Sequence, residues 1–323
     1  CRYVAFSSEA TNLILGDVNG FSDIFIVDTV TGTISLQSIS TAGVQANGSS
    51  FKPSVSHTGR FLVFESSATN LVGTTTVGVT HIYLRNRDVN NSGTFDTPGN
   101  TSTTLISQST GSVAGNGNSI QAAISGDGSF VTFASDATNL DPAAPAVTAG
   151  RRHIYLRNLT TGFVATTMVD VGVGLVEANA SSRAPAINRN PGVSAGFSAD
   201  GRYIVFGSEA SNLVAGDTNS VSDIFVYDRV GGTRTRVSVS STGAEGTNPS
   251  AVGFRLGSIN PSISSTGRYV TFASLANNLA AGDSGGQTAV TPVDSNGAVD
   301  VFVHDRDADA DDVFDEVAAA PRG

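Results

Sequence analysis

Two segments of this 323-residue chain place oxygen-bearing side chains at the alternating positions that calcium-binding loops use. In the first segment, positions 1, 3, 5 and 9 are Asp88, Asn90, Ser92 and Asp96. In the second segment, the same positions are Asp307, Asp309, Asp311 and Asp315. Ca²⁺ prefers hard oxygen ligands, and carboxylates this close repel one another without a cation, so the spacing predicts calcium at both segments. The alternative is a solvated acidic hairpin.

Both segments depart from the complete EF-hand pattern, which has glycine at position 6 and a bidentate glutamate at position 12. Gly93 meets the first requirement, whereas Asp312 stands at that position in the second segment. Position 12 is Gly99 in one segment and Ala318 in the other. We therefore expect weak calcium affinity unless a neighbouring loop supplies a further ligand.

A second acidic pattern, seven residues long, occurs three times with oxygen-bearing side chains at its first, third and seventh positions. The three sets are Asp17, Asn19 and Asp23; Asp217, Asn219 and Asp223; and Asp294, Asn296 and Asp300. One interpretation is again a ring of ligands for Ca²⁺. The other is a tight turn in which the last aspartate starts a strand and bonds to its own backbone. His81 and His153 replace that aspartate in two further copies, so both interpretations stay open.

Signals for catalysis are weak in this sequence. Residues 282–286 read Gly-Asp-Ser-Gly-Gly around Ser284 and copy the serine motif of chymotrypsin-like proteases, but no segment resembles that family's histidine motif. Such a serine needs a base within hydrogen-bond reach. The histidines lie in a turn or at strand ends, and they are His57, His81, His153 and His304. We therefore expect no catalytic residues, and no cofactor other than Ca²⁺.

The elements that position these side chains come from an internal repeat. A strand of aromatic and β-branched residues is followed by a polar stretch that ends in Asn-Leu. The five copies of this strand begin at Tyr3, Phe61, Phe130, Tyr203 and Tyr269. A repeat of this length indicates one supersecondary unit stacked on copies of itself, so that the array rather than the single unit folds.

Each unit has the pattern of four strands. A short inner strand and a glycine-containing turn precede the repeated strand, and a third strand and an exposed outer strand follow it. The expected inner strands are 53–56, 122–125, 194–198 and 261–264. The expected third strands begin at Asp23, His81, His153, Asp223 and Asp300. Radial repetition of such units predicts an all-β fold, a β-propeller of four-stranded antiparallel blades with five repeat units visible, the first and last incomplete.

The five units divide a single β-propeller domain, 1–323, at about 1–52, 53–120, 121–193, 194–260 and 261–323, and we interpret this domain as a fragment of a longer chain. The inner strands carry serines that we expect to line a central channel: Ser54, Ser56, Ser125, Ser198, Ser262 and Ser264. In a propeller, the two kinds of acidic segment would lie on opposite faces.

An asparagine also recurs in the loop between each outer strand and the next inner strand. Its copies are Asn47, Asn116, Asn179 and Asn248. These side chains either line a ligand site or brace their own loops through hydrogen bonds to the backbone. The bracing role also suits Asn12, Asn70, Asn139, Asn212 and Asn278.

One family resemblance rests on these repeated residues. Pro-Ser-Ile-Ser at 261–264, Gly-Arg at 267–268 and Tyr-Val-Thr-Phe-Ala-Ser at 269–274 resemble the PD40, or WD40-like, repeat of TolB-type propellers. The Asp-Ile-Phe-Val sequence at the start of the third strand fits the same pattern. The resemblance covers nearly the whole chain and implies a propeller fold. It implies no single function, because this repeat serves many roles.

The composition excludes several classes of partner. The net charge is −10 and Lys52 is the sole lysine, so the basic stripe of a nucleic-acid-binding protein is absent. Cys1 is the sole cysteine, which excludes a disulfide framework. No apolar run reaches the length of a membrane span. This composition is typical of an extracellular or cell-envelope protein, in the periplasm or at the cell surface.

Together these features predict a secreted or cell-envelope, calcium-stabilised propeller that acts as a binding or scaffolding module for a protein or glycan ligand on a loop face. The alternative is an extracellular polysaccharide-active enzyme, a hydrolase or lyase, on the same scaffold. A polar cluster outside the repeat would favour the enzyme, and the departures of that kind are 151–153 and 183–189.

Overall fold

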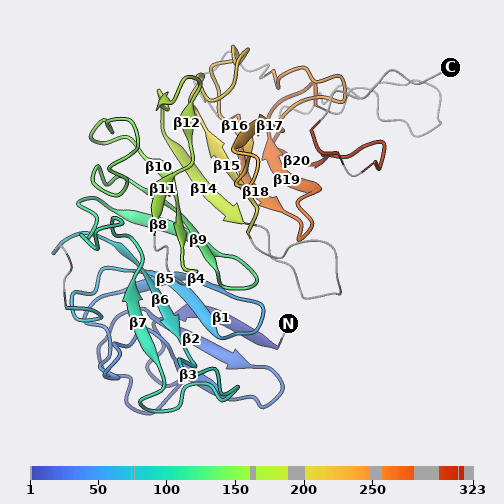
Figure 1. Cartoon of the computed structure of the whole chain (residues 1–323). Coiled ribbons are helices and arrows are strands. Elements are labelled where there is room, and N and C mark those ends of the chain that lie inside the picture. The colour runs from blue at the N-terminus through green and yellow to red at the C-terminus, as the bar shows by residue number, and fades with distance from the viewer. Residues whose placement is uncertain are drawn as a thin grey trace.

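The computed structural model describes residues 2–73, 75, 77–160, 165–187, 201–247, 257–279, 298–311 and 313–315. Within these residues there are twenty strands and no helix. The strands form antiparallel sheets in which neighbouring strands are also neighbours in the chain. Figure 1 shows the sheets following one another from the N-terminus to the C-terminus. The fold is all-β, a β-propeller of antiparallel blades, which confirms the fold predicted from the repeat.

Five sheets form the blades. Blade 1 contains β1 (Tyr3–Ser8), β2 (Asp23–Asp28) and β3 (Ile34–Leu36). Blade 2 contains β4 (Ser50–Val55), β5 (Phe61–Ser66), β6 (His81–Asn86) and β7 (Ser102–Leu105). Blade 3 contains β8 (Ser119–Ile124), β9 (Phe130–Ser135), β10 (His153–Asn158) and β11 (Thr166–Met168). Blade 4 contains β14 (Ser182–Ile187), β15 (Tyr203–Ser208), β16 (Asp223–Asp228) and β17 (Thr233–Arg236). Blade 5 contains β18 (Ser258–Ile263), β19 (Tyr269–Ser274) and β20 (Asp300–Asp305). A separate hairpin of β12 (Val171–Gly172) and β13 (Val176–Glu177) follows blade 3.

The core lies between consecutive blades, which pack through the two middle strands of each sheet. Between blades 2 and 3, Val63 and Ile82 pack with Phe133 and Tyr155. Equivalent positions form the cores of the other three junctions. Because successive side chains of a strand point to opposite faces, each middle strand of blades 2 to 4 contributes to two junctions. This is why a single unit cannot bury its apolar surface alone.

The inner strands differ from the prediction in position. Three of them begin at residues 50, 119 and 258, rather than at 53, 122 and 261. In blade 4 the prediction was wrong, because β14 at 182–187 pairs with β15 and the predicted segment 194–198 lies outside the described residues. Pro-Ala-Ile at 185–187 matches Pro-Ser-Val at 53–55. More residues separate β14 from β15 than separate the inner strand from the repeated strand in the other blades. The sequence pattern therefore placed the inner strand of blade 4 too close to β15.

A β-bulge interrupts each of the four described inner strands. The register of each shifts at one residue with positive φ: Lys52, Gln121, Ala184 and Asn260. Such a bulge changes which side chains point to each face. Of the serines predicted to line the channel, Ser54, Ser56 and Ser125 are buried, whereas Ser262 is exposed and Ser264 is half-buried. The hydroxyl oxygen of Ser125 accepts a hydrogen bond from the Phe130 N–H at 3.0 Å and fixes the turn. A channel lined by these serines stays a prediction.

Candidate functional site

The acidic loop of blade 2 folds around the carboxylate of Asp88. Asp88 Oδ1 accepts hydrogen bonds of 3.0 Å from the backbone N–H and the hydroxyl of Ser92, and Oδ2 accepts one of 2.7 Å from the Gly93 N–H. The side-chain amide of Asn100 donates to Asp88 Oδ1 and to Asn90 Oδ1, both at 2.8 Å. Burial alone would raise the pKa of the Asp88 carboxyl, but these donors outweigh it and lower that pKa to about 2.

The oxygens of Asp88 and Asn90 converge as the spacing predicted, but they converge on the NH₂ group of Asn100. Its orientation is fixed, because Asn100 Oδ1 accepts a hydrogen bond of 2.9 Å from the Asn90 N–H. A cation at this point would have to displace the Asn100 NH₂ group. Asn100 lies beyond the twelve-residue pattern, so sequence analysis missed it. Calcium at this loop stays a prediction.

The residues at position 9 do not join the oxygens of their loops. Asp96 forms an ion pair of 2.7 Å with Arg87, and Asp315 forms one of 2.5 Å with Arg306. Asp96 also accepts a hydrogen bond of 2.8 Å from Ser35 of blade 1. Each arginine directly precedes its acidic loop. The spacing pattern takes no account of such an arginine, which competes with a cation for the carboxylate. These two carboxylates fasten the end of the loop to the blades.

The acidic loop of blade 5 brings three carboxylates together. Oxygen atoms of Asp307, Asp309 and Asp311 lie within 4.8 Å of one another. Two ligands that each lie about 2.4 Å from one cation are at most about 4.8 Å apart, so these three oxygens fit a single Ca²⁺. Arg268 contacts Asp307 at 3.2 Å and offsets part of the negative charge. The loop that departs further from the EF-hand sequence therefore has the better ligand geometry.

The seven-residue loops of blades 1 and 4 have a different geometry. Asn19 Nδ2 donates to Asp23 Oδ2 at 2.8 Å and to the Ala46 carbonyl at 2.9 Å, while Asn19 Oδ1 accepts from the Phe21 N–H. Asn219 makes the same three kinds of hydrogen bond in blade 4. The amide therefore presents N–H rather than oxygen to the carboxylate. This favours the tight-turn alternative, and calcium binding at these loops stays a prediction.

The first aspartates of these loops also have protein partners. Asp17 Oδ1 accepts a hydrogen bond of 2.8 Å from Gln45. Asp217 lies 3.5 Å from Arg236. Burial, and next the negative charge of Asp223, raise the pKa of Asp217 to about 6. The blade 4 loop therefore has a carboxyl group that takes up a proton more readily than an ordinary aspartate.

Several predicted positions lie outside the described residues. They are Asp294, Asn296, Ser284, Ser198 and Asn248. Asp300 is described and is the first residue of β20.

A polar pair recurs where the third strand of each of the first four blades begins. The pairs are Asp23–Ser38 at 2.5 Å, His81–Ser107 at 3.1 Å, His153–Asp170 at 3.1 Å and Asp223–Ser238 at 2.5 Å. All eight residues are buried. The pair of Ser107 and His81 has the residue types of a nucleophile and its base, but its burial separates it from any substrate.

Blade 3 has the most highly charged version of this pair. His153 Nδ1 lies 3.1 Å from Asp170 and Nε2 lies 3.1 Å from Glu177, which in turn forms an ion pair of 2.6 Å with Arg151. Burial lowers the pKa of His153, but Asp170 and Glu177 outweigh it and raise that pKa above its ordinary value. Both ring nitrogens are engaged, so His153 bridges two carboxylates and has no ring nitrogen free to act as a base.

The recurring asparagines brace the loops, as one of the two alternatives predicted. Asn47 Oδ1 accepts from the Thr69 N–H at 2.8 Å, and Asn70 Oδ1 accepts from the Asn47 N–H at 3.0 Å. Asn70 Nδ2 donates to the Gln45 carbonyl at 2.8 Å. The same pairing joins Asn116 to Asn139 and Asn179 to Asn212. Each pair connects two consecutive blades, so the loop frame is the same from junction to junction.

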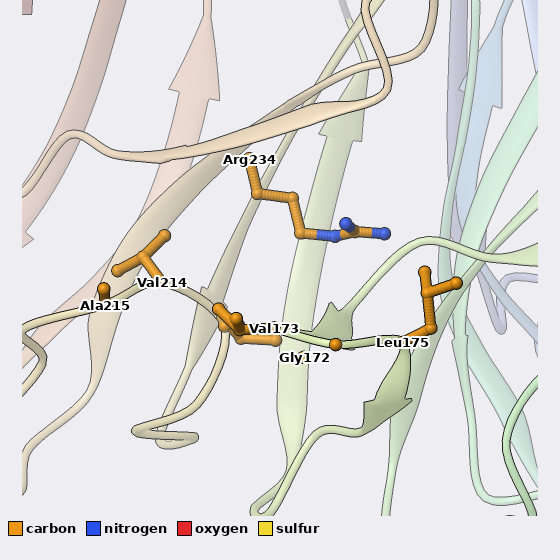
Figure 2. Close-up of a pocket in the computed structure, with 8 residues that line it drawn as sticks. Gly172, Val173, Leu175, Val214, Ala215 and Arg234 are labelled. Carbon is orange, nitrogen blue, oxygen red and sulfur yellow. The ribbon is translucent and has the colours of Figure 1, made fainter.

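A pocket of about 360 Å³ lies between the β12–β13 hairpin and blade 4. Its lining consists of residues 172–175, residues 213–215 and Arg234. Figure 2 shows the Arg234 side chain extending over the hairpin, with its guanidinium directed toward Leu175. Sequence analysis missed this site, because Arg234 belongs to an exposed-looking outer strand and the hairpin resembles any other turn.

Comparisons with known proteins give information about the fold alone. No family model and no curated protein match the chain. TolB from Acinetobacter baumannii aligns over 94% of this chain and 53% of its own, with 14% identity and a TM-score of 0.41. Oligogalacturonate lyase in complex with manganese aligns over 88% of this chain and 54% of its own, with 14% identity and a TM-score of 0.43. The β-propeller domain of the Trilobed protease from Pyrococcus furiosus aligns over 94% and 65%, with 10% identity and a TM-score of 0.45.

The chain thus spans about half the length of the TolB and lyase structures that it matches. Identities this low show a likeness to β-propellers and carry nothing about activity. Within the described residues, no helix is long and apolar enough to cross a membrane.

Proposed function

We propose that this chain is a binding or scaffolding module of a secreted or cell-envelope protein. The observation that carries the proposal is a frame that repeats from blade to blade, with one divergent place after blade 3. Asparagine pairs and buried polar pairs recur with closely similar distances. Rigid frames of this kind present variable loops to ligands. A protein or a glycan on one loop face is the partner class that this role implies.

The two buried histidines, His81 and His153, support binding over catalysis. His153 has both ring nitrogens engaged by carboxylates, and His81 is buried against Ser107. A general base must reach the proton that it abstracts, and neither ring is placed to do so. The competing proposal, a polysaccharide-active enzyme, would need its catalytic groups elsewhere on the propeller.

We also propose that Ca²⁺ stabilises the propeller, and we place it first at the blade 5 loop. The convergence of Asp307, Asp309 and Asp311 supports this order. In blade 2, the NH₂ group of Asn100 competes for the equivalent place. The net charge of −10 and the near-absence of lysine suit a calcium-rich extracellular or envelope setting.

A melting experiment tests the calcium proposal. A ligand at 100 times its Kd stabilises the folded state by about 2.7 kcal/mol, so excess Ca²⁺ should raise the melting temperature by several degrees. Asp309→Asn should remove most of that rise. Glu9→Gln, which removes one exposed negative charge outside the loop, is the control and should retain it. A melting curve indifferent to calcium and chelator would contradict the proposal.

A paired screen tests the binding role against the enzyme. The protein is applied to glycan and protein arrays, and in parallel to polysaccharide, ester and peptide substrates. We expect saturable binding without turnover. Turnover that is abolished by His153→Gln or Ser284→Ala would replace the binding module with the enzyme.

A further inference from the structure

The turn after blade 3 differs from its three sister turns, although all four share one backbone frame. The frame is a bridge between two residues six apart: Ile39–Gln45, Gln108–Ala114, Val171–Glu177 and Val239–Glu245. In the three sisters, a serine hydroxyl accepts the N–H four residues later, and these serines are Ser40, Ser109 and Ser240. Gly172 takes that place after blade 3. The sister turns thus serve as internal controls for what the fold itself requires.

Two apolar side chains replace polar or small residues in this turn. Val173 stands where the sisters have Thr41, Thr110 and Ser241, and it is 61% exposed. Leu175 stands where they have Gly43, Ser112 and Gly243, and it is 78% exposed. Its φ is 60°, in the left-handed region that a bulky side chain adopts only at a cost of roughly 1–2 kcal/mol. The fold does not need these apolar groups, and one of them strains it.

Arg234 adds a positive charge beside these apolar groups. Its Nε donates to the Val169 carbonyl at 2.6 Å, and its guanidinium carbon lies 5.0 Å from the centre of the Tyr227 ring. Among the residues that the structure describes, neither Nη nitrogen has a hydrogen-bond partner. Asp170 is close enough to interact electrostatically with Arg234, but its carboxylate is paired with His153. Arg234 therefore offers two N–H-bearing nitrogens to a ligand in the pocket.

The equivalent groove between blades 1 and 2 lacks this combination. It has a volume of about 620 Å³ and is lined by residues 40–42, residues 69–73 and Thr103. Thr103 occupies the strand position of Arg234 and is bonded to Thr41. Hydroxyl groups thus take the place of Arg234 and Val173, whereas Leu71 and Val72 keep the apolar positions of Leu213 and Val214.

Resting on the proposed binding role, we propose that the pocket between the β12–β13 hairpin and blade 4 binds an acidic peptide segment of a protein partner. A carboxylate of the segment pairs with Arg234, as guanidinium groups bind carboxylates bidentately. A neighbouring apolar side chain packs on Val173, Leu175 and Val214. A glycan is the poorer occupant, because the side chains that line the pocket include no hydroxyl to bond sugar hydroxyls and no aromatic ring to stack on a sugar face. Exposed apolar groups rimmed by charge are typical of protein-binding surfaces.

Isothermal titration calorimetry with three probes tests the proposal. The probes are acetyl-Leu-Glu-Leu-amide, its Gln analogue and glucuronic acid. We expect saturable binding of the acidic peptide with a Kd of about 1 mM, and binding at least about tenfold weaker for the other two. The affinity should fall with added salt, because the pairing is between charges. Equal binding of the Glu and Gln peptides, or tighter binding of glucuronic acid, would overturn the proposal.

Variants assign the binding to the pocket. Arg234→Gln should weaken binding about tenfold, and Thr103→Ala in the sister groove should leave it unchanged. Leu175→Gly guards against loss through unfolding, because it should weaken binding while it relieves backbone strain. If array ligands bind the Arg234→Gln variant as well as the wild type, this pocket is not the site, although the binding role stands. If neither the probes nor the arrays show binding, both proposals fall.

Discussion

His153 and Asp170 form a buried pair that two substitutions can convert into the pair of another blade. The double variant His153→Asp with Asp170→Ser recreates the Asp–Ser pair of blades 1 and 4. Asp170→Ser alone recreates the His–Ser pair of blade 2. His153→Asp alone places a carboxylate against Asp170, with Glu177 on its other side, and two facing carboxylates are absent from the four described pairs. The repeat therefore predicts two tolerated variants and one that is strongly destabilised.

The magnitude follows from the geometry. Two unit charges about 4 Å apart repel by about 4 kcal/mol at an effective dielectric constant of 20. Keeping one carboxyl protonated at pH 7 costs about the same, because a pKa near 4 must rise by about three units at 1.36 kcal/mol each. We expect losses in the free energy of unfolding of about 4 kcal/mol for His153→Asp and about 1–2 kcal/mol for Asp170→Ser. The double variant should lose no more than about 2 kcal/mol, which gives a coupling energy of about 3 kcal/mol or more.

Urea unfolding at pH 7 measures the four corners of this cycle. A second readout is pH. In His153→Asp, burial and repulsion raise a carboxyl pKa in the folded state above its unfolded value. The variant should therefore regain stability as the pH falls from 7 to 5, which an ordinary packing defect would not do. Additive losses, with a coupling below about 0.5 kcal/mol, would refute the reasoning.

Three further predictions concern single residues. The pKa of His153 is raised in the folded state, so protonated His153 stabilises the fold fully below about pH 6.5, and this stabilisation is lost as the pH rises through the folded-state pKa. Burial lowers the pKa of His81, so neutral His81 is compatible with the fold above about pH 6.5, and stability is lost as the pH falls below that value. NMR titration should place the two imidazoles on opposite sides of that value, and shifts of the same sign would contradict this. Leu175→Gly should raise the free energy of unfolding by about 1 kcal/mol, because φ is 60° there; a loss in urea unfolding would count against strain. Gly128→Ala should cost at least about 2 kcal/mol, because φ is 80° and the new Cβ would lie 2.3 Å from the Phe61 ring; a variant as stable as wild type would show that the ring can move.

The middle strands were predictable because their signal is local. β5 and β19, for example, begin at the predicted Phe61 and Tyr269. Aromatic and β-branched residues in alternation suit a strand that packs on both faces, and five copies made the pattern hard to mistake. The inner strands were harder, because a bulge at Lys52 and its equivalents changes the alternation within the strand. The alternation of residues along a strand cannot show where a bulge inserts an extra residue.

The candidate sites show the same limit. Spacing located the acidic loops, but it could not show that Asn100 enters one loop or that Arg87 takes Asp96 away. Those partners come from outside the spaced positions and depend on the closed loop. The pair of His153 and Glu177 could not be predicted from the sequence either, because the two residues meet only when the β12–β13 hairpin folds back over the start of β10. Side-chain competition decides what an acidic loop does, and it becomes visible only in three dimensions.

The acidic loops also meet the preceding blade through aromatic rings. The loop of blade 2 brings Phe95 to 5.4 Å from Tyr3, and the loop of blade 5 brings Phe314 to 5.6 Å from Tyr203, measured between ring centres. Each tyrosine is the first residue of the repeated strand in the preceding blade, β1 or β15. Aromatic pairs at such distances stabilise by about 0.5–1.5 kcal/mol beyond their buried area. The loops therefore act at the junctions between blades.

The two remaining described junctions have no acidic loop, and the repeated strand there begins with phenylalanine rather than tyrosine. In one of them Phe61 and Leu159 both pack against the core cluster, and in the other the guanidinium of Arg229 lies 4.1 Å from the centre of the Phe130 ring. Tyrosine in one blade thus accompanies an acidic loop in the next, and phenylalanine accompanies a short turn. This pairing makes the acidic loop part of the junction rather than an appendage on the surface. A cation held by such a loop would act on the stiffness between two blades, which agrees with a stabilising role for Ca²⁺ and with a binding surface elsewhere, at the Arg234 pocket.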